Sequence, residues 1–157
     1  MNKFVAVCLG VLMVVSVGIS RAKVEAFALA DRVGEPDERS FFLFSTSAGN
    51  YIIRQDGMGE YTSPKGMRRV FYLKLGAKGR IDRVYFLEHE GDLFLLYAAH
   101  DATSEWAYLT RMEQMKRKAR WLTPLSSGDV QAPQIDGDVV VIGSTEIDKL
   151  NGRVRQD

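Results

Sequence analysis

The sequence predicts an all-β protein made of antiparallel sheets. Short runs rich in β-branched and aromatic residues recur along residues 41–157 and alternate with turn-forming segments that contain Gly or Pro. After the N-terminal leader, no long window keeps the 3.6-residue apolar period of an amphipathic helix. In addition, two segments of the C-terminal half match each other, one beginning at Met112 and one at Ile147. These three observations favour regularly spaced strands over helices.

The chain opens with a leader of the secretory type. Lys3 precedes an uncharged apolar run from Phe4 to Ile19, and small residues follow it. We expect residues 1–22 to be a signal peptide cleaved after Ala22, with an uncleaved membrane anchor as the alternative. The protein is therefore expected to be periplasmic or secreted, or membrane-anchored if the leader is retained.

Cleavage would also change the cysteine content and the charge balance of the chain. It removes Cys8, the only cysteine, so no disulfide is expected in the mature protein. It leaves 19 basic and 20 acidic residues, because Lys3 and Arg21 are lost from the 21 basic residues of the full chain. This near-neutral balance argues against a dedicated nucleic-acid binder.

The mature chain is expected to have a linker at 23–40 and one β domain at 41–157. The linker is expected because Asp31 to Ser40 is polar and contains Gly34 and Pro36. A loop is expected at 61–67, which contains Pro64 and Gly66. Strands are expected where apolar and β-branched residues run together, at 41–44, 51–54, 70–75, 83–87, 93–99, 106–111, 119–122, 139–142, 146–148 and 153–155.

Two of these predictions are specific enough to test. Residues 93–99 are almost fully apolar, which predicts a strand with both faces covered by other layers. Residues 112–120 could form a helical turn, but the β-branched and aromatic residues beside them favour the tip of a hairpin, turning at 114–118.

The matching segments start 35 residues apart. Each has an apolar residue, an acid, a polar turn, a basic residue and a strand-like tail. A repeat of this period, with strands on both sides, predicts stacked propeller-like blades, that is, a partial propeller. A β-sandwich is the alternative.

The residues from Trp121 to Arg155 resemble one blade of the quinoprotein-like (PQQ-repeat) β-propellers. Those repeats carry a strand after Asp-Gly, then Leu-Asp, a Thr-Gly turn and a Trp. Here residues 136–141 supply the Asp-Gly and the strand, Ile147-Asp148 takes the Leu-Asp place, and Asn151-Gly152 takes the turn. Gln156 stands where Trp is expected. The turn glycine matters because that position often needs a positive φ.

The preceding unit of the repeat departs further from the pattern. Met112-Glu113 replaces Leu-Asp, Lys116-Arg117 replaces the turn, and Trp121 matches. The resemblance covers about residues 84–155 and implies two to three blades, with a degraded copy at 75–80. It implies that the Trp packs between neighbouring sheets.

So few blades do not close a ring, since propellers usually need about four or more. The chain would form an open stack, complete a ring as a homo-oligomer, or be a sandwich that mimics the repeat. Full-length enzymes of the family bind PQQ and a metal ion at the ring centre, which this chain does not supply, so we expect no cofactor and no metal. Non-enzymatic propellers act as docking surfaces.

No residue set predicts an active site. Glu88-His89-Glu90 could offer metal ligands, but alternate residues of a strand point to opposite faces, so the three do not converge simply. His100 is expected to bond to the adjacent Asp101. Residues 136–138 are interpreted as a turn and not as a calcium loop, because the following residues carry no oxygen ligands.

One strong charge cluster is a candidate partner-binding site. It consists of basic residues at the expected hairpin tip, Arg111, Lys116, Arg117, Lys118 and Arg120. The simpler interpretation is a solvated tip, and the functional one is an anionic partner such as an acidic protein surface or lipid headgroups. Tyr51, Tyr61 and Tyr72 could form a contact patch if they are exposed.

These observations favour an exported, non-enzymatic β-repeat module that mediates protein–protein interaction. Its partner is expected to be an exported or membrane-associated protein, and a homo-oligomer is kept open. One alternative is a small-molecule-binding β-sandwich, and the other is part of an oligomeric quinoprotein-like enzyme. The small-molecule alternative would place an apolar pocket among four side chains, Phe86, Leu95, Tyr97 and Trp106.

Overall fold

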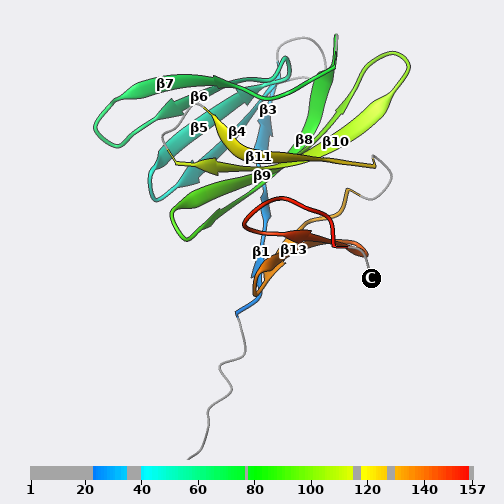
Figure 1. Ribbon diagram of the computed structural model, residues 1–157. Helices are drawn as coiled ribbons and strands as arrows, with labels where there is room; N and C mark the ends of the chain where they lie inside the picture. The colour runs from blue at the N-terminus through cyan, green and yellow to red at the C-terminus, as the bar shows by residue number, and fades with distance from the viewer. Residues whose placement is uncertain (1–22, 35–39, 77, 115–117, 127–129, 156–157) are drawn as a thin grey trace, which may run out of the picture.

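A computed structural model of the chain describes residues 23–34, 40–76, 78–114, 118–126 and 130–155. All regular elements in these residues are strands of three antiparallel sheets, which confirms the all-β prediction (Figure 1). Sheet I has the order β3-β4-β5-β6-β7, sheet II has the order β11-β10-β9-β8-β2, and sheet III has the order β1-β12-β13-β14. None of the three closes on itself.

Most of each sheet is a meander of consecutive strands. Sheet I contains β4 (Phe41–Thr46), β5 (Gly49–Arg54), β6 (Met58–Thr62) and β7 (Arg68–Tyr72). Sheet II contains β8 (Arg80–His89), β9 (Asp92–His100), β10 (Glu105–Glu113) and β11 (Ala119–Leu125). Sheet III contains β12 (Gln134–Asp136), β13 (Val139–Ile142) and β14 (Thr145–Asp148).

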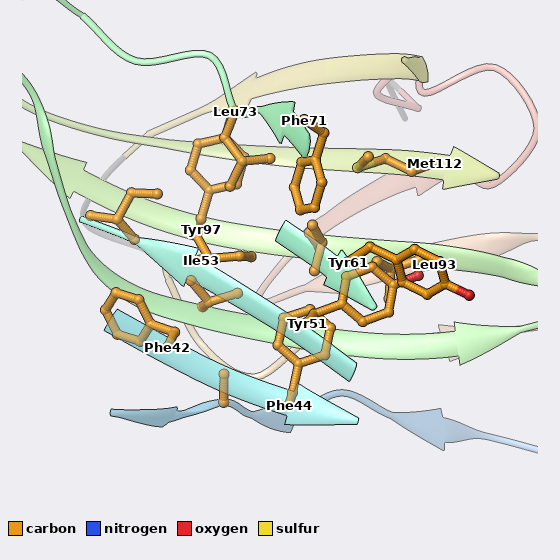
Figure 2. Packing of buried hydrophobic residues seen from close by; sticks show 14 of the residues in the cluster. Phe42, Phe44, Tyr51, Ile53, Tyr61, Phe71, Leu73, Leu93, Tyr97 and Met112 are labelled. Atoms are coloured by element: carbon orange, nitrogen blue, oxygen red, sulfur yellow. The ribbon is translucent and has the colours of Figure 1, made fainter. Parts of the chain in front are cut away.

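Sheet II is the middle layer, because its central strand β9 is covered on both faces. Leu93, Leu95 and Tyr97 pack with buried residues of sheet I. Phe94 and Leu96 point the other way and pack with buried residues of sheet III. The prediction that residues 93–99 form a strand covered on both faces is therefore confirmed. Figure 2 shows the first of these layers, where Tyr97 and Leu93 face aromatic side chains of sheet I.

The turn of the β8–β9 hairpin follows from its residues. Glu90 and Gly91 both have positive φ, 52° and 79°, and they join the paired residues His89 and Asp92. Two consecutive residues with positive φ match the right-handed twist of the flanking strands. The predicted strands 83–87 and 93–99 are therefore joined by a tight two-residue turn.

The largest correction concerns residues 23–40, which we expected to be a linker. The structure places β1 (Glu25–Ala26), β2 (Ala28–Leu29) and β3 (Asp31–Val33) there. Each pairs with the first strand of a meander: β1 with β12, β2 with β8, and β3 with β4. We call residues 25–33 the spine segment, since it joins all three sheets (Figure 1). Strands of two or three residues are too short to show a two-residue period in the sequence.

Smaller corrections concern sheet I and sheet III. The expected loop at 61–67 begins only after β6, and β7 runs over residues 68–72 instead of 70–75. Gly59 lies within β6, where an added Cβ would stand 2.1 Å from the Phe71 ring. A glycine in a strand can thus mark a close packing contact. β12 is a further strand that the sequence did not predict.

Candidate functional site

The predicted basic cluster is not a single surface. Lys118 is exposed, and Arg120 is partly exposed, with its Nη2 atom donating to Glu113 Oε1 over 2.5 Å. Arg111, by contrast, is only 7% exposed. Lys116 and Arg117 lie outside the described residues. Arg111 is therefore not part of an exposed basic surface.

Arg111 instead forms a buried ion pair between sheets II and III. Its Nε atom donates to Asp92 Oδ2 over 2.5 Å, and its Nη1 atom donates to Lys149 O over 2.8 Å. Asp92 is also buried, and the guanidinium lies over the Phe94 ring at 5.4 Å. The two-residue strand period could have revealed this, since Arg111 follows the buried Leu109 on the same face.

A second polar group lies beside this pair. Lys149 Nζ lies 3.0 Å from His89 Nε2 and 3.1 Å from Glu90 Oε2. Because an ammonium only donates, His89 accepts at Nε2, and its Nδ1 atom donates to Glu25 Oε2 over 2.9 Å. The contacts link the spine segment, the β8–β9 turn and the turn after β14. They form a clasp that holds sheet III against sheet II.

The structure corrects part of the histidine analysis. Glu88 does point away from His89, as expected, and accepts from the backbone nitrogen of Ser47 over 2.6 Å. His89 and Glu90, however, meet at Lys149. His100 bonds to Asp82 across the sheet over 2.5 Å, and not to Asp101. Among the described residues, no group of three or more His, Cys, Asp or Glu side chains is placed to hold a metal ion.

The clasp should make stability depend on acid pH. The hydrogen bond from His89 holds the pKa of Glu25 below its ordinary value, and the hydrogen bond from Lys149 does the same for the pKa of Glu90. A carboxyl group with a lowered folded-state pKa stabilises the fold near neutral pH, and this contribution is lost as pH falls below about 4.5.

We therefore expect Glu25→Gln to lower the urea midpoint of unfolding near neutral pH. The difference from wild type should shrink as the pH falls from about 4.5 through the lowered pKa of Glu25, because the carboxylate then becomes protonated. Glu146→Gln, at an exposed position, should leave the urea midpoint unchanged both near neutral pH and at acid pH. If Glu25→Gln lowers the urea midpoint equally near neutral pH and at acid pH, the charge of Glu25 is not the cause of the loss.

The two matching segments pack against each other. Trp121 Nε1 donates to Lys149 O over 3.2 Å, and Thr123 Oγ1 donates to Gly152 O over 2.5 Å. Trp121, in β11 of sheet II, thus packs against the turn after β14. Gly152 has a φ of 73°, so the expected positive φ at this turn is confirmed.

Comparing Gly152→Ala with Gly91→Ala tests the contact between Gly152 and Trp121. An added Cβ at Gly152 would lie 2.6 Å from Trp121 Cδ2, whereas nothing lies within 4 Å of one at Gly91. Both glycines have positive φ, so each change to alanine costs about 1–2 kcal/mol from the backbone. Gly152→Ala should cost about 1–3 kcal/mol more, because the indole must shift. Urea unfolding followed by tryptophan fluorescence measures both, and equal losses would contradict the contact.

The face of sheet I that points away from sheet II exposes four large apolar side chains, Val33, Ile52, Val70 and Tyr72. We call it the free face. The side chains of Phe42, Tyr51 and Tyr61 are buried on the inner side, so the alternate positions point outward. Seven of these outward side chains are apolar: Val33, Phe41, Leu43, Ile52, Met58, Val70 and Tyr72.

The free face is mixed, because its outward positions also carry polar side chains, among them Arg54, Glu60 and Arg68, whereas a strictly alternating solvated face is polar throughout. Tyr72 is 75% exposed, and Ile52 and Val70 are 37% and 39% exposed. Of the three tyrosines proposed as a contact patch, only Tyr72 is available, because Tyr51 and Tyr61 are buried. Ile52 and Val70 were not predicted to be exposed, although they alternate with Ile53 and Phe71, which are buried.

A second surface feature is an open groove of about 450 Å³ at the start of the spine segment's pairing with sheet I. Its apolar lining includes Leu29, Phe44 and Phe86, and Asp31 lies at the same site. The four side chains expected around an apolar pocket do not share one. Leu95 and Tyr97 are fully buried in the core, and Trp106 covers Gly76 and Gly79.

Comparison with known proteins adds no relative: no family model, curated protein or solved structure matches this chain. The resemblance to PQQ repeats therefore stays a prediction. Within the described residues, we find no helix with the length and apolar character needed to cross a membrane.

Proposed function

We propose that this chain is an exported, non-enzymatic β-repeat module that binds another protein. The observation that carries the proposal is the free face, where Ile52 on β5 and Val70 and Tyr72 on β7 are exposed on either side of β6. Exposed apolar groups gathered on one sheet face favour protein binding, and tyrosine is enriched in interfaces. Export is supported by the apolar leader at residues 1–22.

Arginine and glutamate side chains lie among the apolar groups of this face. Arg54 and Glu60 interrupt the apolar rows, and Glu60 is the register partner of both Ile52 and Val70. An apolar surface with interspersed charges suits a partner that is itself water-soluble, because the charges can be paired at the interface. The partner expected here is thus another exported protein with a complementary apolar surface.

Site-specific cross-linking in the exporting cell tests this proposal. A photoreactive residue at Tyr72 should give discrete cross-linked products, and one at Leu150 should not, although Leu150 is 69% exposed. Ile52→Glu should reduce the Tyr72 products at least about tenfold, because it places an unpaired charge in the contact. Products that are equal at both positions, or unchanged by Ile52→Glu, would contradict a binding role for the free face.

The groove supports a second candidate, the binding of a small apolar molecule. Its volume and its mixture of aromatic and polar lining residues are typical of ligand sites. Tyr72 does not line it. Binding of an apolar dye that survives Tyr72→Glu, in a protein that forms no specific cross-links, would favour this candidate over protein binding.

A further inference from the structure

We propose that the chain carries a separate binding site for a small hydrophilic oxyanion, in a groove between the β5–β6 turn and the turn that precedes β8. The groove has a volume of about 390 Å³ and is lined by Gln55, Asp56, Lys78, Gly79 and Arg80. It shares none of these residues with the free face or with the groove at the spine segment. The inference therefore goes beyond the proposed function, and its failure would leave protein binding by the free face untouched.

The side-chain amide of Gln55 is the observation that carries the inference. Gln55 lines the groove although the residue is only 7% exposed. Its Oε1 atom has no hydrogen-bond partner in the part of the chain that the structure describes. The terminal torsion of glutamine is broad, so the amide can turn either its acceptor or its donor toward the groove. Leaving a buried amide unpaired is costly, and a bound ligand would remove this cost.

Lys78 supplies a positive charge at the same groove. Its side chain is exposed, and within the described part of the chain its ammonium has no ion-pair partner. Its backbone has a φ of 61°, a left-handed conformation that is unfavourable for residues other than glycine. The turn around it packs closely on Trp106, since an added Cβ would lie 3.0 Å from the indole at Gly76 and 2.6 Å from it at Gly79. This packing fixes the place of Lys78 beside Gln55.

Backbone hydrogen bonds hold the two walls of the groove together. Ile81 N donates to Gln55 O over 2.9 Å and so joins the start of β8 to the β5–β6 turn. The backbone nitrogens of Gly57 and Gly79 close the two turns with hydrogen bonds of 2.9 and 3.0 Å. The groove is therefore formed before any ligand arrives, and preorganisation of this kind lowers the cost of binding.

The lining selects a small hydrophilic anion. The described residues that line the groove include no apolar side chain, and two of them, Lys78 and Arg80, are cationic. The carboxylate of Asp56 is already paired with Arg54 over 2.8 Å. A carboxylate or phosphate group can accept hydrogen bonds from the Lys78 ammonium and from the Gln55 amide. The volume lies near the lower end of the range of ligand sites, which suits a small molecule.

An NMR titration tests the inference on the full chain, expressed with its leader in an exporting host and purified in the form that accumulates. Inorganic phosphate and citrate are the probes, because they carry the two kinds of oxyanion. The side-chain amide signals of Gln55 and the backbone amide signal of Gly79 should shift and saturate at about 1–10 mM, as expected for a ligand held by few contacts. Saturation by phosphate alone would assign the site to phosphates, and saturation by citrate alone would assign it to carboxylates. If neither probe gives a saturable shift at these residues, the inference is overturned.

Two variants separate binding from a structural role. Lys78→Gly removes the ammonium and relieves the left-handed strain, so it should weaken binding at least about tenfold while raising the urea midpoint of unfolding. Gln55→Met keeps the shape of the side chain without its amide, so it should weaken binding without lowering the midpoint. Lys65→Gln, the loss of an exposed lysine outside the groove, should change neither the affinity nor the midpoint. An affinity that is unchanged in Lys78→Gly or in Gln55→Met would overturn the assignment to this groove.

Discussion

Arg111→Met is expected to lower the free energy of unfolding by about 3–5 kcal/mol, the cost of removing one partner of a buried ion pair. The change leaves Asp92, which is 4% exposed, without its main cation. It also removes the donor from Arg111 to Lys149 O, which links sheet II to sheet III. Arg120 Nε, 3.7 Å from Asp92 Oδ2, is a second nearby cation and places the loss toward the lower end of the range.

Matched variants make the Arg111 result specific. Lys118→Met removes a charge from the same predicted basic cluster at an exposed position and should change stability by no more than about 0.5 kcal/mol. Adding Asp92→Leu to Arg111→Met should recover much of the loss, because it removes the unpaired carboxylate. Urea unfolding measures all three, and a loss under about 1 kcal/mol for Arg111→Met would mean that the surface interpretation of this residue was sound after all.

The strands that were predicted are those whose own residues carry the signal. Residues 93–99 are apolar throughout because β9 has a sheet on each face, and 139–142 coincides with β13. In such cases, the local composition is sufficient to predict the strand. The hairpin turn at Glu90-Gly91 was also visible, since Gly favours the positive φ found there.

The spine segment was missed because its strands depend on the rest of the chain. β1 to β3 are two or three residues long and are fixed by pairing with β12, β8 and β4, which are remote in sequence. The same limit applies to the candidate sites. The bond from His100 to Asp82 crosses a sheet, and the meeting of His89 with Glu25 and Lys149 joins three distant segments.

Arg111 illustrates a different limit. Its basic neighbours in the sequence suggested an exposed cluster, whereas its position in β10 places it on the same face as Ala107 and Leu109, which are fully buried. For a basic residue within a strand, the alternation of faces decides burial more than the charge of its sequence neighbours does. A buried carboxylate must be present to pair with the basic side chain. Asp92, beside the β8–β9 turn, supplies that carboxylate.

Phe27→Ala is expected to lower the free energy of unfolding by about 3–5 kcal/mol, as for other buried phenylalanines. Phe27 is 5% exposed and packs edge-on against Phe94, with ring centroids 6.3 Å apart, in the core between sheets II and III. Its backbone nitrogen donates to Pro133 O over 3.0 Å, at the start of sheet III. Losing this side chain should therefore loosen both the spine segment and the contact between the two sheets.

A second substitution in the same segment tests whether this segment is a structural spine or only a linker. Leu29→Ala, two residues further on but 56% exposed, should change stability by no more than about 0.5 kcal/mol. If residues 23–40 acted as a linker, Phe27→Ala would be equally mild. Hydrogen exchange gives an independent measure, since the amides of Phe27 and Ala30 donate to Pro133 O and Val84 O and should be protected in wild type. Rapid exchange at both amides would mean that the segment does not hold the three sheets together in solution.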